Sequence, residues 1–217
     1  MSLKITLVAD NLNSWIIPYV KKLKELLEKD KYQVFITDDA NKIRLGDLAF
    51  FLSCEKIVSK EVLSLSKHNL VIHESKLPKG KGWSPLTWQI LEGKNKIPIT
   101  LFEAVTAVDS GDIYNQDTMA FKGNELVDEL RVMQGEKTIE LALDFVRSYP
   151  DIKSVKQKGK SSYYPRRRSS DSELDINKTI KDQFNLLRIV DNERYPAFFQ
   201  YKGQRYIVKI FKAEKKQ

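Results

Sequence analysis

Residues 4–39, KITLVADNLNSWIIPYVKKLKELLEKDKYQVFITDD, decide the fold class, because a strand pattern, a helical pattern and a second strand pattern follow one another. Both ends of this stretch are short apolar runs rich in β-branched side chains, which is typical of buried strands. Between them, residues 14–29 place apolar side chains at helical spacing, and Ser14 is the expected N-cap. The stretch therefore predicts a β-α-β unit with parallel strands.

The same alternation continues along the chain. Further strands are predicted at residues 47–53, 69–74, 97–105 and 112–121, and helical segments at 59–67, 84–93 and 124–150. Gly135 is a point at which the last of these helices can break. We therefore expect an α/β fold with an open, Rossmann-like and mostly parallel sheet.

The C-terminal third has a different pattern. Residues 153–175 are polar and read as a linker or an ordered arm, residues 179–190 as a helix, and residues 198–211 as a hairpin around Lys202 and Gly203. We expect a main domain at residues 1–150 and a small basic α+β subdomain at residues 151–217.

Composition excludes several classes of protein. Hydrophobic residues make up 41% and charged residues 30% of the 217 residues, which is typical of a globular protein. The lone Cys54 excludes an internal disulfide framework and a cysteine-based zinc site, and with only two histidines no metal is expected. No apolar run approaches the ~18 residues of a membrane span, and no signal peptide is recognisable. We expect a cytoplasmic protein without a membrane partner.

The net charge of +8 is unevenly distributed. Residues 151–217 hold 17 Lys and Arg against 8 Asp and Glu, a net charge of +9, so the rest of the chain is close to neutral. This asymmetry suggests an anionic partner, either nucleic acid or a phosphorylated small molecule, and the alternative is a solvated basic surface. The loop after the first strand contains no glycine, which excludes a dinucleotide-binding turn and a P-loop there.

Two residues stand out as candidates for chemistry. His73 ends a predicted strand, and Asp109 lies in a glycine-containing turn between two others. Ligands of open α/β sheets bind at the carboxyl ends of strands, where a histidine and an aspartate from neighbouring loops can meet. Such a pair orients and charges an imidazole for acid–base work.

The segments around these two residues resemble the folate-dependent formyltransferases. The likeness is carried by HESKLPKGKGWSPLTWQILEG (73–93), IPITLFE (97–103) and AVDSGD (107–112). The family's H-x-S-x-L-P-x-x-x-G-x-x-P spacing is matched in full, its threonine corresponds to Thr100, and its catalytic aspartate corresponds to Asp109. The resemblance implies the formyltransferase fold and an enzyme that uses N10-formyltetrahydrofolate as co-substrate.

The resemblance also implies a mechanism. An amine attacks the formyl carbon, His73 donates a hydrogen bond to the oxyanion and transfers a proton near the attacking nitrogen, and Asp109 holds the ring and relays the proton through water. The family carries an asparagine two residues before the histidine, where this chain has Val71. Asn69 is the nearest amide on that side of the strand, but four residues span roughly 13 Å, too far to substitute from a regular strand.

The resemblance assigns the remaining candidates. The pterin is expected among backbone groups of two segments, at Cys54, Glu55, Lys56, Ile57, Val58, Val105, Thr106 and Val108. The acceptor is expected to contact Lys81, Trp83, Arg167, Arg188, Asn192 and Tyr195. Arginine suits phosphate, and tyrosine can stack on a base.

Three acceptors or functions compete. The sequence of residues 80–93 is similar to that of small nucleotide-sugar N-formyltransferases from bacterial surface-glycan pathways such as that of pseudaminic acid. This similarity implies that the acceptor is a UDP-linked 4-amino-deoxy sugar. A methionyl-tRNA formyltransferase is the second alternative. The small number of residues after Pro150 argues against it. A non-catalytic nucleic-acid-binding protein on a decayed formyltransferase fold is the third. Whether the chain forms a homodimer stays open.

Overall fold

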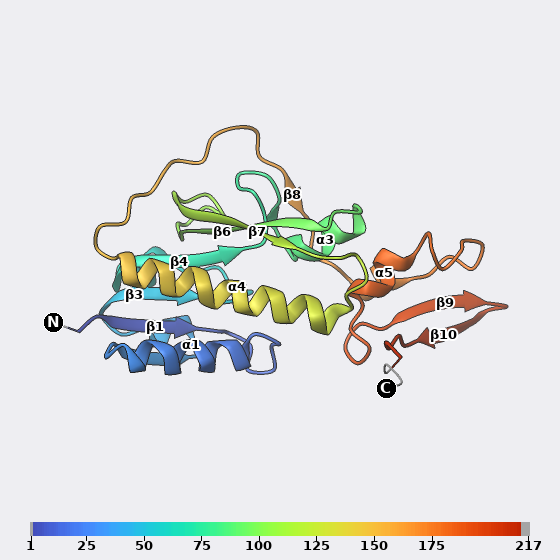
Figure 1. Ribbon diagram of the computed structural model, residues 1–217, viewed down its shortest axis with the longest axis horizontal. Helices are drawn as coiled ribbons and strands as arrows, with labels where there is room; N and C mark the ends of the chain where they lie inside the picture. Colours follow the sequence, from blue (N-terminus) through green and yellow to red (C-terminus); the bar gives the residue numbers. More distant parts are fainter. Residues whose placement is uncertain (1, 214–217) are drawn as a thin grey trace.

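The centre of the protein is a six-stranded sheet with the strand order β2-β1-β3-β4-β6-β7 (Figure 1). The computed structural model describes residues 2–213. The first four strands in this order are parallel, whereas the last two are antiparallel to their neighbours. The strand bounds are β1 Lys4–Val8, β2 Gln33–Thr37, β3 Gly46–Phe51, β4 Ser66–His73, β6 Lys96–Glu103 and β7 Ile113–Ala120. The predicted α/β class and mostly parallel sheet are confirmed.

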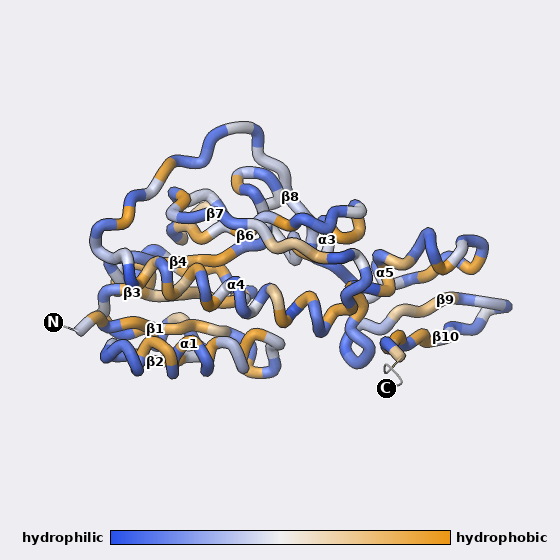
Figure 2. The backbone as a smooth tube through the Cα atoms, viewed as in Figure 1, coloured by the Kyte–Doolittle hydropathy of each residue, from blue (hydrophilic) through white to orange (hydrophobic). Residues whose placement is uncertain are grey.

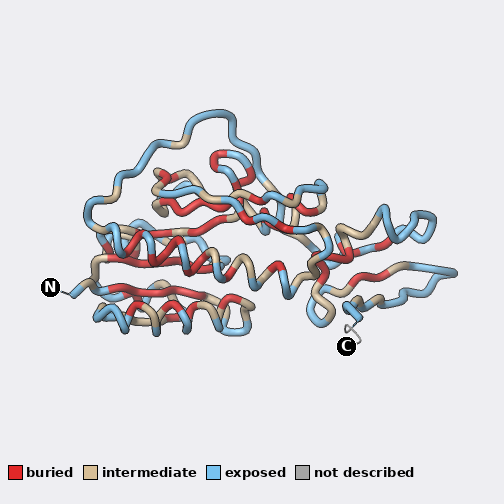
Figure 3. Tube along the Cα trace, viewed as in Figure 1, coloured by how far each residue is buried: buried red, intermediate tan, exposed pale blue. Residues whose placement is uncertain are grey.

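The inner strands are buried along their length, as expected for parallel strands covered by other elements. Leu7 on β1 pairs in register with Phe50 on β3, which pairs with Leu70 on β4, and all three side chains are fully buried. Hydrophobic and buried residues follow the same strands in Figures 2 and 3.

Two long helices, α1 (Ile17–Lys29) and α4 (Val127–Ser148), pack against each other and against this sheet. Gly135 lies where they touch, because a Cβ atom there would be 2.4 Å from the ring of Tyr19. The expected break at Gly135 is therefore wrong: the glycine permits close helix packing inside one continuous helix. Shorter helical segments are η1 Ala40–Lys42, α2 Lys60–Leu63 and α3 Pro85–Leu91.

The expected N-cap at Ser14 is also wrong. The helix begins three residues later, with Pro18 in its first turn, and the Ser14 carbonyl closes the preceding turn by accepting from the Ile17 N–H at 3.2 Å. None of the helices in residues 2–213 combines the length and the apolar character that crossing a membrane requires.

The chain after α4 first returns along the main sheet as an exposed arm (Figures 1 and 3). Val155 forms a bridge with Ile113 of β7, and β8 (Tyr163–Tyr164) pairs in parallel with β5 (Lys81–Gly82). The polar segment 153–175 is thus an ordered arm, one of its two predicted forms.

A second, small core follows the arm. It is formed by Leu174, Leu187, Val190 and Ala197. The predicted helix at 179–190 is shorter than expected, α5 (Phe184–Ile189), because the residues before it form turns. The predicted hairpin is present, and the remaining bounds are η2 Ser169–Ser172, β9 Ala197–Tyr201 and β10 Gln204–Val208.

Candidate active site

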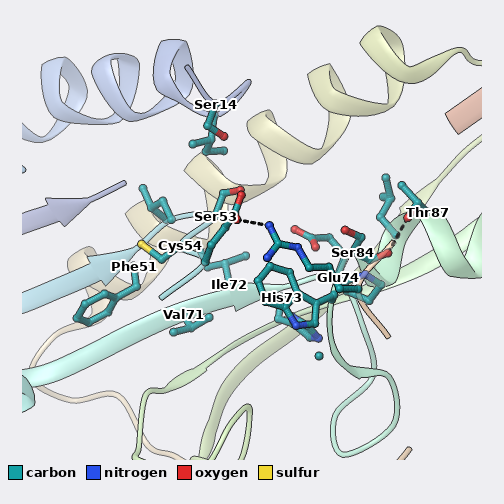
Figure 4. Close-up of a pocket in the computed structure, with 18 of the residues that line it drawn as sticks. Ser14, Phe51, Ser53, Cys54, Val71, Ile72, His73, Glu74, Ser84 and Thr87 are labelled. Atoms are coloured by element: carbon teal, nitrogen blue, oxygen red, sulfur yellow. Dashed lines mark hydrogen bonds and ion pairs between the residues drawn. The ribbon is translucent and has the colours of Figure 1, made fainter. Parts of the chain in front are cut away.

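A cavity of about 530 Å³ opens at the carboxyl ends of β3 and β4. Its walls come from these strand ends, from α4, from the loop after β6 and from the C-terminal arm. His73, the last residue of β4, lines it (Figure 4), and Asp109 is a further lining residue. The topology therefore brings the two predicted catalytic residues to one site, as ligand sites of open α/β sheets require.

The His73 ring is buried and tightly positioned. Its Nε2 atom donates to the carbonyl oxygen of Gly80 at 2.8 Å and lies 3.7 Å from Oδ2 of Asp109. Since a carbonyl oxygen only accepts, Nε2 carries a hydrogen. The other ring nitrogen, Nδ1, becomes a second donor only when the ring is positively charged.

Asp109 is fixed by both its side chain and its backbone. Oδ2 accepts from the Gly82 N–H at 2.8 Å, and the Gln157 side-chain amide donates to the carbonyl oxygens of Asp109 (2.9 Å) and Gly111 (2.8 Å). The φ angle of Asp109 is +47°, in the left-handed region that costs a non-glycine residue about 1–2 kcal/mol. The surrounding hydrogen bonds thus hold a strained turn, which is common at functional sites.

Lys81 is hydrogen-bonded to this turn and does not line the cavity. It is 5% exposed, and its Nζ donates to Oγ of Ser110 at 2.7 Å. The expected substrate contact at Lys81 is therefore corrected to a structural one, because the side chain points away from the cavity into the turn that carries Asp109.

The wall predicted to hold the pterin is present as one surface. All eight of its predicted residues line the cavity, namely Cys54, Glu55, Lys56, Ile57, Val58, Val105, Thr106 and Val108. Asp10 shapes the first of these segments, because its Oδ2 accepts from the backbone N–H groups of Glu55 (2.8 Å) and Lys56 (2.9 Å). Burial, and secondarily Asp10, raises the pKa of Cys54 to about 12, so its thiol is not a nucleophile at neutral pH.

No amide of β4 reaches the ring of His73. Asn69 is buried outside the cavity, where its Nδ2 donates to the carbonyl oxygen of Leu63 at 2.8 Å. The doubtful catalytic candidate Asn69 is thereby corrected to a structural residue. Val71 lines the cavity instead and packs against Leu77 and Phe102, so this side of the site is apolar.

The opposite wall is aromatic and cationic. Trp83 lines the cavity, and the Arg166 guanidinium lies 4.5 Å above its ring while it pairs with Glu55 at 2.8 Å. Trp88 is outside the cavity, where it stacks on Tyr164. Arg167 and Tyr195, both predicted acceptor contacts, also line this wall.

Comparison with known proteins agrees with this geometry. The sequence profile of the formyl transferase family matches residues 24–139. The chain belongs to the formyl transferase family. Similar solved structures have the same fold.

The first of these structures is a methionyl-tRNA formyltransferase from Clostridium thermocellum, with 21% identity, a TM-score of 0.81, and coverage of 100% of this chain and 96% of that one. A 4-N formyltransferase from Francisella tularensis has 18% identity, a TM-score of 0.74 and 98% coverage of both chains. HypX from Aquifex aeolicus, solved in complex with tetrahydrofolic acid, has 18% identity and a TM-score of 0.79; 97% of this chain covers 38% of HypX.

Two predicted acceptor contacts of the formyl transferase lie away from the cavity. Arg188 is 1% exposed, and its guanidinium donates to Oδ1 of Asn95 (2.9 Å) and pairs with Glu125 (3.3 Å). Asn192 is held by reciprocal hydrogen bonds with the backbone of Ile210. Both are corrected to structural residues that attach the C-terminal core, because their polar atoms are already bonded to protein.

Sequence reasoning missed several residues that line the cavity of the formyl transferase, namely Glu74, Arg131, Arg166, Arg168 and Arg194. Glu74 could have been predicted because it directly follows His73. Arg166 and Arg168 could have been predicted because they belong to a run of three arginines at residues 166–168. Nothing in the sequence distinguishes the other two arginines from exposed surface charge.

Proposed function

We propose that this formyl transferase moves a formyl group from N10-formyltetrahydrofolate to the amine of a nucleotide-linked amino sugar. A UDP-linked 4-amino-deoxy sugar of a bacterial surface glycan is the preferred acceptor. The observation that carries the proposal is that one cavity is lined by the His73–Asp109 pair, by the loops predicted to hold the pterin, and by an arginine-rich wall.

The loops on the first wall fit a pterin. Ile57, Val105 and Val108 are exposed apolar residues that line the cavity, which suits a flat heteroaromatic ring. N10-formyltetrahydrofolate supplies the activated formyl carbon. The tetrahydrofolic acid complex of HypX, which has the same fold, supports this co-substrate.

The catalytic pair fits acyl transfer to nitrogen. The His73 ring, which lies beside Asp109, donates a hydrogen bond to the oxygen that becomes negative when the amine attacks. Asp109 orients the ring and, through water, passes the amine proton toward the departing nitrogen. Val71 makes the neighbouring side of the site apolar.

The second wall fits a phosphorylated acceptor. Arg168 and Arg194 line the cavity and form no ion pair with a carboxylate in the described part of the chain, and Arg167 has a buried Nε atom without a partner there. Guanidinium groups with free donors bind phosphate oxygens bidentately. Tyr195, half-exposed at the same wall, is placed to stack on a base.

A methionyl-tRNA acceptor is the second candidate. The +9 charge of residues 151–217 favours nucleic acid, and coverage of 96% of the Clostridium thermocellum chain removes chain length as an argument against it. A decayed, non-catalytic protein fits less well, because both His73 and Asp109 are retained in bonded positions.

A turnover assay tests the proposal. The chain is incubated with N10-formyltetrahydrofolate and UDP-, dTDP- or GDP-linked amino sugars, and in parallel with charged initiator tRNA. We expect turnover with a nucleotide sugar, whereas turnover with tRNA alone would establish the second candidate. His73→Ala and Asp109→Ala should each lower kcat by about 10²–10⁴-fold without unfolding the protein, since general acid–base groups contribute this much. Near-normal kcat in either variant contradicts the assigned roles.

A further inference from the structure

Among the described residues, Glu74 is the carboxylate of the cavity that has neither an ion pair nor a close positive partner. Four carboxylates of the described residues line the cavity. Glu55 pairs with Arg166 at 2.8 Å, Asp191 pairs with Arg131 at 2.9 Å, and Asp109 lies beside His73. Glu74 has no ion pair with any residue in the range 2–213.

The position of Glu74 is determined by its neighbours. It directly follows His73, and the two residues lie side by side at the end of β4 (Figure 4). The Gln134 amide on α4 donates to Oε1 at 2.7 Å, and the Gln89 amide on α3 donates to the backbone carbonyl at 2.6 Å. Among the described residues nothing bonds to Oε2, so this oxygen is available to a ligand in the cavity.

The surroundings of Glu74 disfavour its charge. Burial raises the pKa of this carboxyl, His73 and the Gln134 hydrogen bond act in the opposite direction, and Asp109 raises it slightly further. The side chain that bonds the carboxyl from α4 is the neutral amide of Gln134, and the neutral amide of Gln89 on α3 bonds the adjacent backbone carbonyl. An unpaired carboxylate in such a place is costly to the protein unless a ligand supplies a donor or a positive charge.

Resting on the proposed function, we propose that Glu74 receives the acceptor's amino group as an ammonium ion and removes its first proton. An aliphatic amine is protonated at neutral pH and has no lone pair with which to attack. Transfer of one proton to Oε2 turns R–NH3⁺ and the carboxylate into R–NH2 and a carboxylic acid. The freed electron pair then forms the C–N bond.

The remaining protons are accounted for by the other groups. Of the three protons of the ammonium, one goes to Glu74, one leaves through His73 and Asp109 to the departing folate nitrogen, and one stays on the formamide product. Glu74 returns its proton to water when the product leaves. A carboxyl group with a raised pKa is a better base for this step than an ordinary glutamate, because its basicity is closer to that of the amine.

The pH dependence of Glu74→Gln tests the proposal. Glutamine keeps an oxygen for the Gln134 hydrogen bond but cannot take a proton. We expect kcat/KM for the amino sugar to fall about 100-fold near pH 7, which is the scale of general-base catalysis. The deficit should narrow as the pH approaches the pKa of the amine, about 8–10, because the amine is then already neutral. Glu140→Gln, a carboxylate on the exposed side of α4, is the matched control and should behave as wild type.

A deficit that is the same at every pH indicates a structural role and overturns the proposal, as does wild-type activity of Glu74→Gln. If the wild type turns over no amino sugar, the proposed function fails. The role of Glu74 is then tested separately, by measuring the binding of nucleotide sugars. By titration calorimetry, the wild type should bind a UDP-linked 4-amino sugar about tenfold more tightly than its 4-hydroxy counterpart, a difference of about 1.4 kcal/mol. Glu74→Gln should lose this preference. A wild type without the preference, or a variant that keeps it, overturns the proposal.

Discussion

The ionisation of Glu74 affects the stability of the fold as well as the proposed chemistry. Burial raises its pKa, so the folded protein holds the proton of this carboxyl more strongly than the unfolded chain does. A carboxyl with a raised folded pKa contributes stability below its ordinary range and loses that contribution as the pH rises through the folded pKa. Above the folded pKa, the ionised side chain therefore weakens the fold.

Glu74→Gln should consequently stabilise the protein, but only where Glu74 is ionised. We expect a Tm increase of a few degrees at about pH 8 and none at about pH 4, measured by calorimetry, since about 1 kcal/mol shifts the Tm of a domain of this size by roughly 2–4 °C. Glu140→Gln removes an equal charge from an exposed ion pair and should produce no such rise. An equal Tm for wild type and Glu74→Gln at both pH values would contradict the cost assigned to this residue.

At the scale of elements, the two-residue strand β5 positions the proposed catalytic pair, His73 and Asp109. The Gly80 carbonyl before it accepts from His73, and the Gly82 N–H donates to Asp109. β5 is held in turn by β8 of the arm, which approaches so closely that a Cβ at Gly82 would lie 2.5 Å from the Tyr164 carbonyl oxygen. The arm after α4 is therefore part of the candidate active site, although it is distant in sequence.

Gln157→Met tests the contribution of the arm. The change removes the two hydrogen bonds to the backbone of the Asp109 turn, each worth about 0.5–1.5 kcal/mol. We expect kcat to fall about tenfold, which corresponds to about 1.4 kcal/mol of transition-state stabilisation, while the KM values of both substrates change little. Lys156→Met, an exposed neighbour on the arm, is the control. Unchanged kcat in Gln157→Met would show that the turn keeps its geometry without the arm.

At the scale of the whole molecule, the cavity joins two regions of opposite character. The pterin loops extend from the nearly neutral main sheet, whereas Arg168, Arg194 and Tyr195 come from the basic C-terminal third. Arg188, buried against Asn95 and Glu125, attaches this third to the sheet. The walls proposed to bind the phosphate and the pterin are thus separate.

This separation predicts a selective effect on the acceptor. Arg168→Ala and Arg194→Ala should each raise the KM for the nucleotide sugar about tenfold, near 1.4 kcal/mol, and leave the KM for N10-formyltetrahydrofolate unchanged. Steady-state kinetics with each substrate varied in turn measures both values. Lys181→Ala removes an exposed charge from the same third outside the cavity and serves as the control. An equal rise in the KM values of both substrates would contradict the assignment of these arginines to the acceptor wall.

Much of the site could be predicted because it is carried by contiguous motifs at strand ends. His73 and Asp109 follow strands whose carboxyl ends converge, so a β-α-β reading already brings them together. The predictions at Lys81, Arg188 and Asn192 were wrong for a common reason. A polar side chain can point into the cavity or into the protein, and residue type alone does not decide its direction.

The sequence by itself determined the α/β class, the mostly parallel sheet, the family and the identity of the His73–Asp109 pair, since these follow from local apolar periodicity and short-range spacing. Only the tertiary structure decided which carboxylate stays unpaired, which arginines face the cavity and which residues hold Asp109 in its left-handed turn. Those properties depend on contacts between segments far apart in the chain, such as Gln157 with the Asp109 turn and Gln134 with Glu74. Long-range packing sets these contacts, and local sequence patterns do not encode them.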